Sequence, residues 1–121
     1  DERLKGLDAM ALIEVIEHMD TDRLGTLEAN VFGFCRPRHV LLSTPNREYN
    51  VCFDNFGEGK FRHSDHRFEW TRVEFQEWAQ AVAETYSYEC HFEGIGDEHE
   101  TYGPITQMVI FTRKTQVDSL I

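Results

Sequence analysis

The sequence predicts an α/β fold in which parallel strands are joined by crossover helices and the last strand returns antiparallel. Short apolar segments of strand length alternate with segments of helical period, and the last two strand segments follow one another directly. At 121 residues the chain has the length of one domain. Two crossovers are too few to cover both faces of a parallel sheet, so we expect half of a doubly wound domain.

A strand and then a helix are expected at the start of the chain. Residues 9–13 form a short apolar run, which is typical of a buried strand. Asp20 and Thr21 each offer a side-chain oxygen that can cap a helix. The helix should end before Pro37, since the residue before a proline avoids the helical conformation. Its apolar side would carry residues spaced by three or four, namely Leu24, Leu27, Val31 and Phe34.

A second strand and a long loop follow. Residues 40–44 are apolar and β-prone, and the pair Pro45-Asn46 ends them with a turn signal. From residue 45 to residue 70 no period is visible. A connection of this length exceeds the roughly 12–15 residues usual inside a compact domain. Loops longer than that are mostly functional or disordered. Aromatic residues in its sequence indicate an ordered, packed loop (Tyr49, Phe53, Phe56 and Phe61).

A second helix and two strands complete the chain. Thr71-Arg72-Val73-Glu74 has the pattern of a capping box, and the apolar residues after it predict a helix that ends near Ser87. Apolar and polar residues then alternate over residues 88–93, as in a half-buried strand. We expect an acidic loop over residues 94–104 and a last strand over residues 107–112.

Composition excludes several classes of protein. With 22 acidic and 12 basic residues the formal net charge is -10, which argues against general binding along a phosphate backbone. Three scattered cysteines support neither a disulfide framework nor a zinc ribbon, so we expect a reducing compartment, the cytoplasm. The apolar runs are far shorter than the roughly twenty residues of a bilayer span. Asp1 is neither an initiating methionine nor the start of a signal peptide, so we expect an excerpt of a longer chain.

Glu14, Glu17 and His18 form the densest group of chemistry-bearing side chains. On a helix, their spacing of i, i+3 and i+4 would place all three on one face. Two carboxylates and an imidazole suit a divalent cation, and without a thiolate Mg²⁺ or Mn²⁺ is favoured over structural zinc. The group follows a buried strand, which is where α/β folds bind ligands. The alternative is a solvated helix face.

Two further groups lie in the long loop. Its second part holds His63 and His66, either of which can complete a metal shell, with Asp65 or Glu69 as an orienting partner. The alternative for this part is a charged surface turn. Its first part, residues 43–50, carries asparagine amides and a tyrosine ring that can contact a sugar or a base. The alternative there is an ordinary turn.

Three motifs in this order resemble one family closely. They are Glu14-Val15-Ile16-Glu17-His18, then Ser43-Thr44-Pro45-Asn46 with Glu48-Tyr49-Asn50, and then the stretch from Phe61 to Arg72. Each motif is weak alone, but together they are specific. The chain resembles the Hua-enhancer-type RNA 3′-terminal ribose 2′-O-methyltransferases, and its compact form is similar to the bacterial branch used in RNA repair. The resemblance runs from about residue 4 to residue 113.

The resemblance implies a fold and a set of site residues. Residues 1–121 would be the carboxyl half of a Rossmann-like class I methyltransferase fold, with a mostly parallel sheet and a final antiparallel strand. Of the two loop histidines, His63 lies where the family varies and is left outside the metal shell. The implied metal ligands are Glu14, Glu17, His18 and His66, of which His18 and His66 are also the implied catalytic residues. The residues implied to line the RNA end or support the metal site are Thr44, Asn46, Tyr49 and Arg62.

The resemblance also implies cofactors and partners. The family uses S-adenosylmethionine, which it binds through a glycine-rich loop after its first strand and an acidic residue after its second, and this chain contains neither motif. We therefore expect the cofactor site to lie mostly outside the chain, and the chain alone to bind S-adenosylmethionine weakly or not at all and to be inactive. The expected partners are an RNA 3′ end and an RNA end-healing and ligation partner, with no DNA and no membrane.

The implied chemistry agrees with the residue types. A ribose 2′-hydroxyl is a poor nucleophile near neutral pH, and a divalent ion acidifies a bound hydroxyl as it does water. Only the terminal nucleotide has adjacent 2′- and 3′-hydroxyls, so chelation of both would identify an RNA end without reading its sequence, in repair or in end protection. Two other hypotheses stay open. One is a metal-dependent hydrolase with the same ligands, and the other is a non-catalytic α/β interaction module with a solvated acidic surface.

Overall fold

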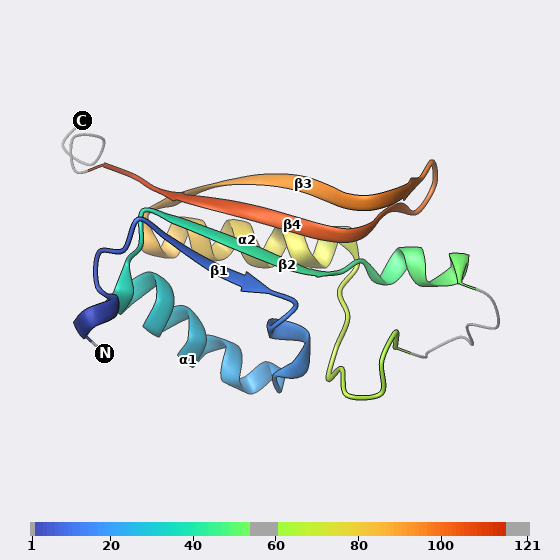
Figure 1. Cartoon of the computed structure of the whole chain (residues 1–121), viewed down its shortest axis with the longest axis horizontal. Helices are drawn as coiled ribbons and strands as arrows, with labels where there is room; N and C mark the ends of the chain where they lie inside the picture. Colours follow the sequence, from blue (N-terminus) through green and yellow to red (C-terminus); the bar gives the residue numbers. More distant parts are fainter. Residues whose placement is uncertain (1, 54–60, 116–121) are drawn as a thin grey trace.

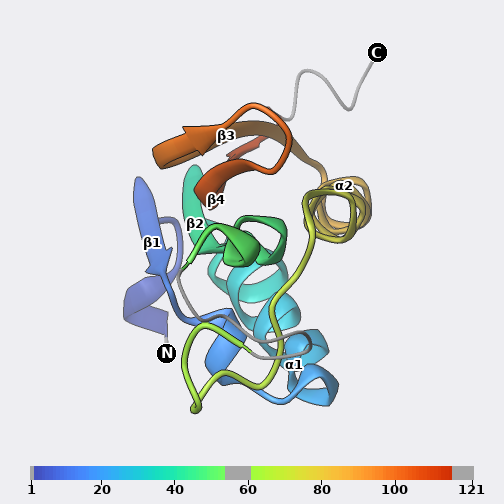
Figure 2. The same ribbon diagram turned by 90° about the vertical axis from the view of Figure 1, so that its right-hand side faces the viewer.

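The computed structural model describes residues 2–53 and 61–115, which form one four-stranded sheet with helices packed against a single face (Figure 1). Figure 2 looks along the strands and shows α1 and α2 on the same side of the sheet. The predicted order of strand, helix, strand, loop, helix, strand and strand is confirmed. The elements are η1 (Glu2–Leu4), β1 (Ala9–Ile13), η2 (Ile16–His18), η3 (Thr21–Arg23), α1 (Leu24–Glu28), η4 (Ala29–Cys35), β2 (His39–Pro45), η5 (Arg47–Cys52), α2 (Arg72–Tyr86), β3 (Tyr88–His99) and β4 (Gly103–Arg113).

The strands lie in the order β1-β2-β4-β3. β1 pairs parallel with β2 in a register that runs from Ala9 opposite His39 to Ile13 opposite Ser43. β4 pairs antiparallel with both of its neighbours, β2 and β3. Strands β1, β2 and β3 therefore share one direction and only the last strand opposes them, which confirms the predicted mostly parallel sheet with a final antiparallel strand.

The first crossover is helical, as predicted, but it is not one regular α-helix. It consists of the 3₁₀ turn η3, the short helix α1 and the π-helical segment η4. Asp20 takes the N-cap position without a side-chain capping bond, and the helix ends at Cys35, before Pro37, as expected. The prediction that Phe34 faces inward is wrong, since Phe34 is 41% exposed and Phe32 is 1% exposed. A π-helix takes more residues per turn than an α-helix, so the inward face moves to a different residue.

The second helix follows its sequence signals closely. Thr71 accepts a hydrogen bond from the Glu74 amide, and the Glu74 carboxylate accepts one from the Thr71 amide, which completes the predicted capping box. The helix ends at Tyr86, where Ser87 adopts a left-handed conformation with φ of 63°. The inward side of α2, which includes Phe75, Ala79 and Val82, packs on the sheet.

The acidic loop predicted over residues 94–104 is wrong, because β3 and β4 form a long hairpin across most of it. β3 continues to His99 and β4 begins at Gly103, with an irregular register between Ile95 and Glu98. Gly96 at φ 81° accommodates this irregularity, which resembles a β-bulge. The strand was missed because residues 93–99 are exposed on both faces of the hairpin and therefore lack apolar alternation.

The hydrophobic core lies between the sheet and the two helical segments that cover it. It is rich in aromatic side chains from every layer, and Phe32, Phe75, Tyr88 and Phe111 are among its largest fully buried members. The Tyr88 hydroxyl donates a 2.6 Å hydrogen bond to the carbonyl of Pro37, so its polar end is satisfied inside the core. Over residues 2–53 and 61–115, the helices are too short or too polar to cross a bilayer.

Candidate metal centre

A cavity of about 270 Å³ opens at the carboxyl ends of β1 and β2. Figure 1 shows the segment after residue 60 returning beside η2 at this end of the sheet, and the amide of Arg67 donates a 2.6 Å hydrogen bond to the carbonyl of Glu17. The cavity thereby collects the four side chains that the sequence predicts as metal ligands. Its lining residues are Glu14, Glu17, His18, Pro45, Arg62, His63 and His66.

The backbone that presents the first three side chains differs from the prediction. The spacing of Glu14, Glu17 and His18 was expected to place them on one face of a helix, but only residues 16–18 are helical, as a single 3₁₀ turn. The amide of Glu14 still bonds the carbonyl of Ser43, and Glu14 then adopts a left-handed conformation with φ of 55°. This conformation ends the strand and prevents a continuous helix, so a tight turn brings the three side chains to the cavity.

Glu17 is the most unusual residue of the cavity, because its carboxylate is fully buried and only half satisfied. Its Oε1 accepts a 2.8 Å hydrogen bond from the hydroxyl of Thr44, the residue next to the end of β2. Its Oε2 has no hydrogen-bond partner among the residues described. Buried carboxylate oxygens are costly without a partner, so this atom is well suited to bind a cation.

His18 and His66 complete a compact donor set around Glu17. One ligand atom from each of the three side chains lies within 4.8 Å of the other two. The Nε2 atom of His18 is 3.6 Å from Oε2 of Glu17, the oxygen that lacks a partner. One carboxylate and two imidazoles form a mixed oxygen and nitrogen donor set, which fits a divalent metal ion.

Glu69 orients His66. The Nδ1 atom of His66 is 2.5 Å from Oε2 of Glu69, and both side chains are buried. A proton on Nδ1 shared with this carboxylate leaves the lone pair on Nε2, the nitrogen that would face a metal. Asn50 and the amide of Arg62 donate to the two oxygens of Glu69 at 2.6 and 2.7 Å, which fixes the carboxylate.

Asp65 was the alternative orienting partner in the sequence, and it makes a different contact. The Oδ2 atom of Asp65 lies 3.2 Å from Nδ1 of His18, and the Asp65 side chain is 70% exposed. The two carboxylates proposed as partners therefore serve different histidines, Glu69 in the interior and Asp65 at the surface. Asn50, one of the asparagines considered for contact with a sugar or a base, donates to Glu69 and holds it in place. The sequence feature that points to Asn50 is its position in the motif that follows the second strand.

Glu14 lines the same cavity, although it is not one of the three closest donors. Partial burial raises the pKa of its carboxyl group above the ordinary value, and the negative charge of Glu17 raises the pKa further. Arg62 and His66 act in the opposite direction. The two carboxylates therefore repel each other across the cavity, and a bound cation would remove that repulsion.

Thr44 and Asn46, two of the residues predicted to contact RNA or support the metal site, lie inside the protein. Thr44 is fully buried and supports Glu17 through the bond already described. Asn46 is also fully buried, and its amide group donates to the carbonyls of Tyr102 and Pro104 at 2.8 Å each. Its Oδ1 accepts from the amide of Glu48, so its polar atoms are used within the fold.

Arg62 and Tyr49, the other two, lie nearer the surface. Arg62 lines the cavity, donates through Nη2 to the carbonyl of Asn46, and places its guanidinium group over the ring of Phe53. Tyr49 packs edge-on against the same Phe53 ring, with 5.6 Å between ring centroids. Contact of these residues with RNA stays a prediction.

The chain is similar to known methyltransferases over nearly all of its length. No protein-family model matches it. The small RNA 2′-O-methyltransferase of Drosophila melanogaster is 41% identical over 124 residues, which cover 97% of this chain and 32% of that protein. The methyltransferase domain of bacterial CtHen1-C is 50% identical, with a TM-score of 0.81, over 95% of this chain and 56% of that chain.

A second similar structure is the Pnkp1/Rnl/Hen1 RNA repair complex, to which the chain is 29% identical with a TM-score of 0.67. That match covers 90% of this chain and 23% of the other. The chain thus spans about a third of the curated relative's length and little more than half of the solved bacterial domain. Each of these three matches covers at least 90% of this chain.

Proposed function

The chain belongs to the small RNA 2′-O-methyltransferase family, and on that premise we propose that the whole protein methylates the 2′-oxygen of the 3′-terminal ribose of RNA. S-Adenosylmethionine is the proposed methyl donor, and Mg²⁺ or Mn²⁺ the proposed metal. The similarity to the RNA repair complex supports a role in RNA repair or end protection, with an end-healing and ligation partner. The proposed location is the cytoplasm.

One observation carries the proposed metal dependence. Oε2 of Glu17 is buried with no hydrogen-bond partner among the described residues, and one ligand atom each of Glu17, His18 and His66 lies within 4.8 Å of the other two. A solvated acidic surface, which is what the interaction-module hypothesis requires, would not bury this carboxylate or the His66 ring, which is 3% exposed. The donor set favours the metal-dependent hypotheses, and the relatives favour methyl transfer over hydrolysis.

The residues of the cavity have distinct proposed tasks. Glu17, His18 and His66 would hold the cation with Glu14, while Thr44 and Glu69 keep two of these groups in position. A divalent cation bound there would supply acidification of a ribose hydroxyl. His18 and His66 are the proposed catalytic histidines. Of the two, His18 is 40% exposed and can exchange a proton with solvent, whereas His66 is buried.

We further propose that residues 1–121 are the carboxyl half of the methyltransferase domain, with the S-adenosylmethionine site mostly outside them. Strand β1 supports this proposal, since within residues 2–53 and 61–115 it pairs only with β2, and its last residue, Ile13, is 52% exposed. Strands of a parallel sheet are normally buried on both faces. Leu4, Leu7 and Val15 near the same strand are also at least 36% exposed.

Methyl transfer to defined RNA ends tests the proposal. The whole protein would be given methyl-labelled S-adenosylmethionine, Mn²⁺ and one of two RNAs that differ only in a 3′-terminal diol or a 3′-deoxy end. We expect label to enter the diol RNA at least tenfold faster, with removal of the metal by a chelator stopping transfer. Equal labelling of both ends would exclude recognition of the diol. Release of the terminal nucleotide without labelling would instead support the hydrolase.

A further inference from the structure

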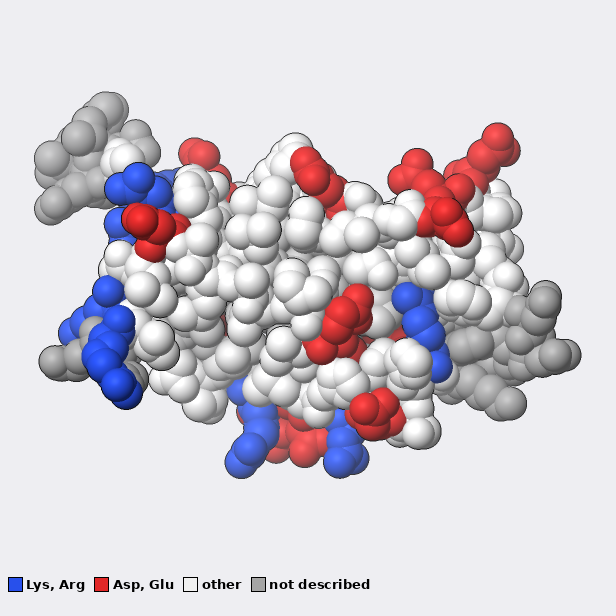
Figure 3. All heavy atoms as spheres, in the orientation of Figure 1, with Lys and Arg blue, Asp and Glu red and all other residues white. Residues whose placement is uncertain are grey.

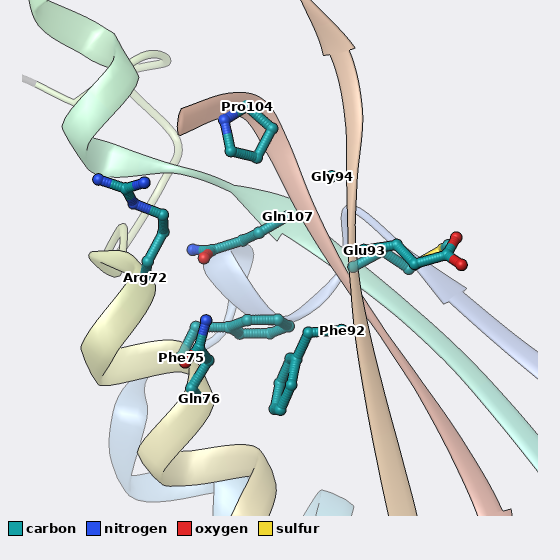
Figure 4. Close-up of a pocket in the computed structure, with 9 residues that line it drawn as sticks. Arg72, Phe75, Gln76, Phe92, Glu93, Gly94, Pro104 and Gln107 are labelled. Atoms are coloured by element: carbon teal, nitrogen blue, oxygen red, sulfur yellow. The ribbon is translucent and has the colours of Figure 1, made fainter. Parts of the chain in front are cut away.

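A second cavity, of about 180 Å³, lies between the start of α2 and the β3–β4 hairpin (Figure 4). We call it the hairpin pocket. Its lining is mixed, with apolar side chains such as Phe92 and Met108 beside polar ones such as Arg72 and Glu93. The lining residues are Arg72, Phe75, Gln76, Phe92, Glu93, Gly94, Pro104, Gln107 and Met108.

Gln107 reaches across the hairpin pocket from β4 toward α2, so that its amide group lies between Arg72 and Phe75 (Figure 4). The residue is 4% exposed. Its Nε2 donates to the carbonyl of Trp70 at 3.0 Å and to that of Pro45 at 3.2 Å. Only the nitrogen of an amide can donate to a carbonyl, so these two bonds determine which way the group is turned.

The oxygen of the same amide is left without a partner. Oε1 of Gln107 is buried and accepts no hydrogen bond from any residue in the described part of the chain. Buried acceptors in native proteins are nearly always paired with protein or ordered water, so this atom can take a donor that the described residues do not supply. The residue that supplies it lines a cavity, which gives such a donor a place to bind.

The size and walls of the hairpin pocket limit the ligand. Its volume equals that of only a few water molecules at about 30 Å³ each, and it is below the roughly 300–1,000 Å³ of pockets for drug-sized ligands. The rings of Phe75 and Phe92 pack edge to face, with 6.0 Å between their centroids and 73° between their planes, and Phe75 is only 1% exposed. The half-buried ring of Phe92 is therefore the face on which a flat ligand can stack. A single flat ring system with an N–H donor fits this size and these groups.

We propose that the hairpin pocket binds a nucleobase through an amino or imino N–H donated to Oε1 of Gln107. This inference rests on the proposed function, since it identifies the base as one belonging to the RNA whose 3′ end reaches the metal centre. Every RNA base carries at least one N–H on its edge and has an aromatic face for stacking. The pocket would thus add affinity for RNA without requiring one sequence.

One hydrogen bond connects the linings of the two cavities, which supports contact of one RNA with both. Pro45 lines the metal-centre cavity, and its carbonyl accepts the bond from Gln107, which lines the hairpin pocket. The second carbonyl bound by Gln107 belongs to Trp70, which follows Glu69 in the chain. Gln107 also lies opposite Thr44 in the β2–β4 register, and Thr44 holds Glu17.

Titration of nucleosides into the whole protein, followed by NMR, tests the proposal. Adenosine carries an exocyclic amino group, whereas purine riboside has the same ring without it. We expect adenosine to shift the side-chain amide signals of Gln107 and the ring signals of Phe75 and Phe92. Purine riboside should bind about tenfold more weakly, because it cannot donate to Oε1. No shift at these residues, or equal binding of both nucleosides, would overturn the proposal.

A matched pair of variants separates the hairpin pocket from the rest of the helix. Gln76 lines the pocket mouth on α2, and Gln80 is exposed one turn further along the same helix. Gln76→Trp should block the pocket and abolish the adenosine shifts, and Gln80→Trp should leave them unchanged. Adenosine shifts that persist in Gln76→Trp would place the binding elsewhere and contradict the proposal.

A metal titration in the same sample tests the proposed metal centre separately from the hairpin pocket. Paramagnetic Mn²⁺ should broaden the signals of His18 and His66, whether or not adenosine is present. Broadening at these histidines without adenosine shifts at Gln107 would overturn the nucleobase pocket and leave the metal centre standing. Adenosine shifts without broadening would support the pocket and count against the metal centre.

Discussion

The hydroxyl of Thr44 donates a 2.8 Å hydrogen bond to Oε1 of Glu17, and it joins the end of β2 to the single helical turn that follows β1. The bond turns the second oxygen of Glu17 toward His18, where it has no partner among the described residues. A buried carboxylate oxygen without a hydrogen-bond partner lowers the stability of the fold, so stability alone does not explain why Glu17 is placed here. The arrangement is therefore expected to cost stability in the absence of a cation.

Glu17→Gln should raise the free energy of unfolding in metal-free buffer by about 1 kcal/mol. The amide retains an oxygen that accepts from Thr44, and it removes a buried charge whose second oxygen has no hydrogen-bond partner in the described part of the chain. Urea unfolding in the presence of a chelator measures the change. Glu77→Gln, at an exposed position of α2, is the control and should change the value by less than about 0.5 kcal/mol. A less stable Glu17→Gln variant would contradict this reasoning.

Glu69→Gln should weaken metal binding by about 10- to 100-fold, because Glu69 holds His66 in the tautomer that leaves Nε2 free. Asp65→Asn is the matched change, since Asp65 is also a carboxylate within 3.2 Å of a ligand histidine but is 70% exposed. We expect Asp65→Asn to change affinity less than about threefold. Calorimetric titration with Mn²⁺ measures both. Equal losses in the two variants would show that burial of the carboxylate is irrelevant.

Glu48 provides a pH-dependent contribution to stability. The hydrogen bonds from Arg72 lower its pKa below the ordinary value. A carboxyl group whose pKa is lowered by folding stabilises the protein at pH values above its pKa in the unfolded chain. This contribution is lost as the pH falls through its pKa in the folded protein. Glu48→Gln should therefore destabilise by about 0.5 kcal/mol at pH 7 and by less at pH 3. Urea unfolding at both values is the measurement, and a difference that grows in acid would contradict the assignment.

Glu28 should show the opposite sign. Burial raises the pKa of its carboxyl group, and the bond from the indole of Trp78 only partly offsets this effect. A carboxyl group with a raised pKa stabilises the folded state at pH values below its pKa in the unfolded chain. This stabilisation is lost as the pH rises through its pKa in the folded protein. Glu28→Gln retains an acceptor for Trp78, so it should be more stable than the parent by up to about 0.5 kcal/mol at pH 7. The difference should vanish near pH 3, and a variant that is less stable at pH 7 would refute it.

The sequence predicts the regular elements well where one local signal dominates. The apolar run at residues 9–13 became β1, and the capping box at Thr71 begins α2. The expected burial of β1 is wrong, since Ala9, Ala11 and Ile13 are exposed. The inward residue Phe32 was missed, because the π-helical segment changes the spacing that an α-helical period assumes. The hairpin beyond residue 93 was missed because its stability comes from pairing with β4, which no local pattern of apolar residues reports.

For the candidate site, residue identities were more predictable than geometry. Glu14, Glu17, His18 and His66 were all singled out, and they do line one cavity. The left-handed turn at Glu14 could not be inferred, since glutamate rarely adopts that conformation. Gln107 was not singled out at all, because its importance depends on two carbonyls that lie 62 and 37 residues away in the chain.

Metal binding should stabilise the fold, because its ligands come from two segments that are far apart in the sequence. Glu17 and His18 follow β1, whereas His66 lies in the segment that leads into α2. A ligand that binds only the folded state stabilises it by about 2.7 kcal/mol at a concentration one hundred times its dissociation constant. Saturating Mn²⁺ should therefore raise the melting temperature by several degrees, and a chelator should reverse the rise. Glu17→Gln and His66→Ala should each abolish it, while Asp65→Asn should keep it. A rise that survives in both ligand variants would move the metal away from this cavity, and no rise in the parent chain would remove the metal centre from the proposed mechanism.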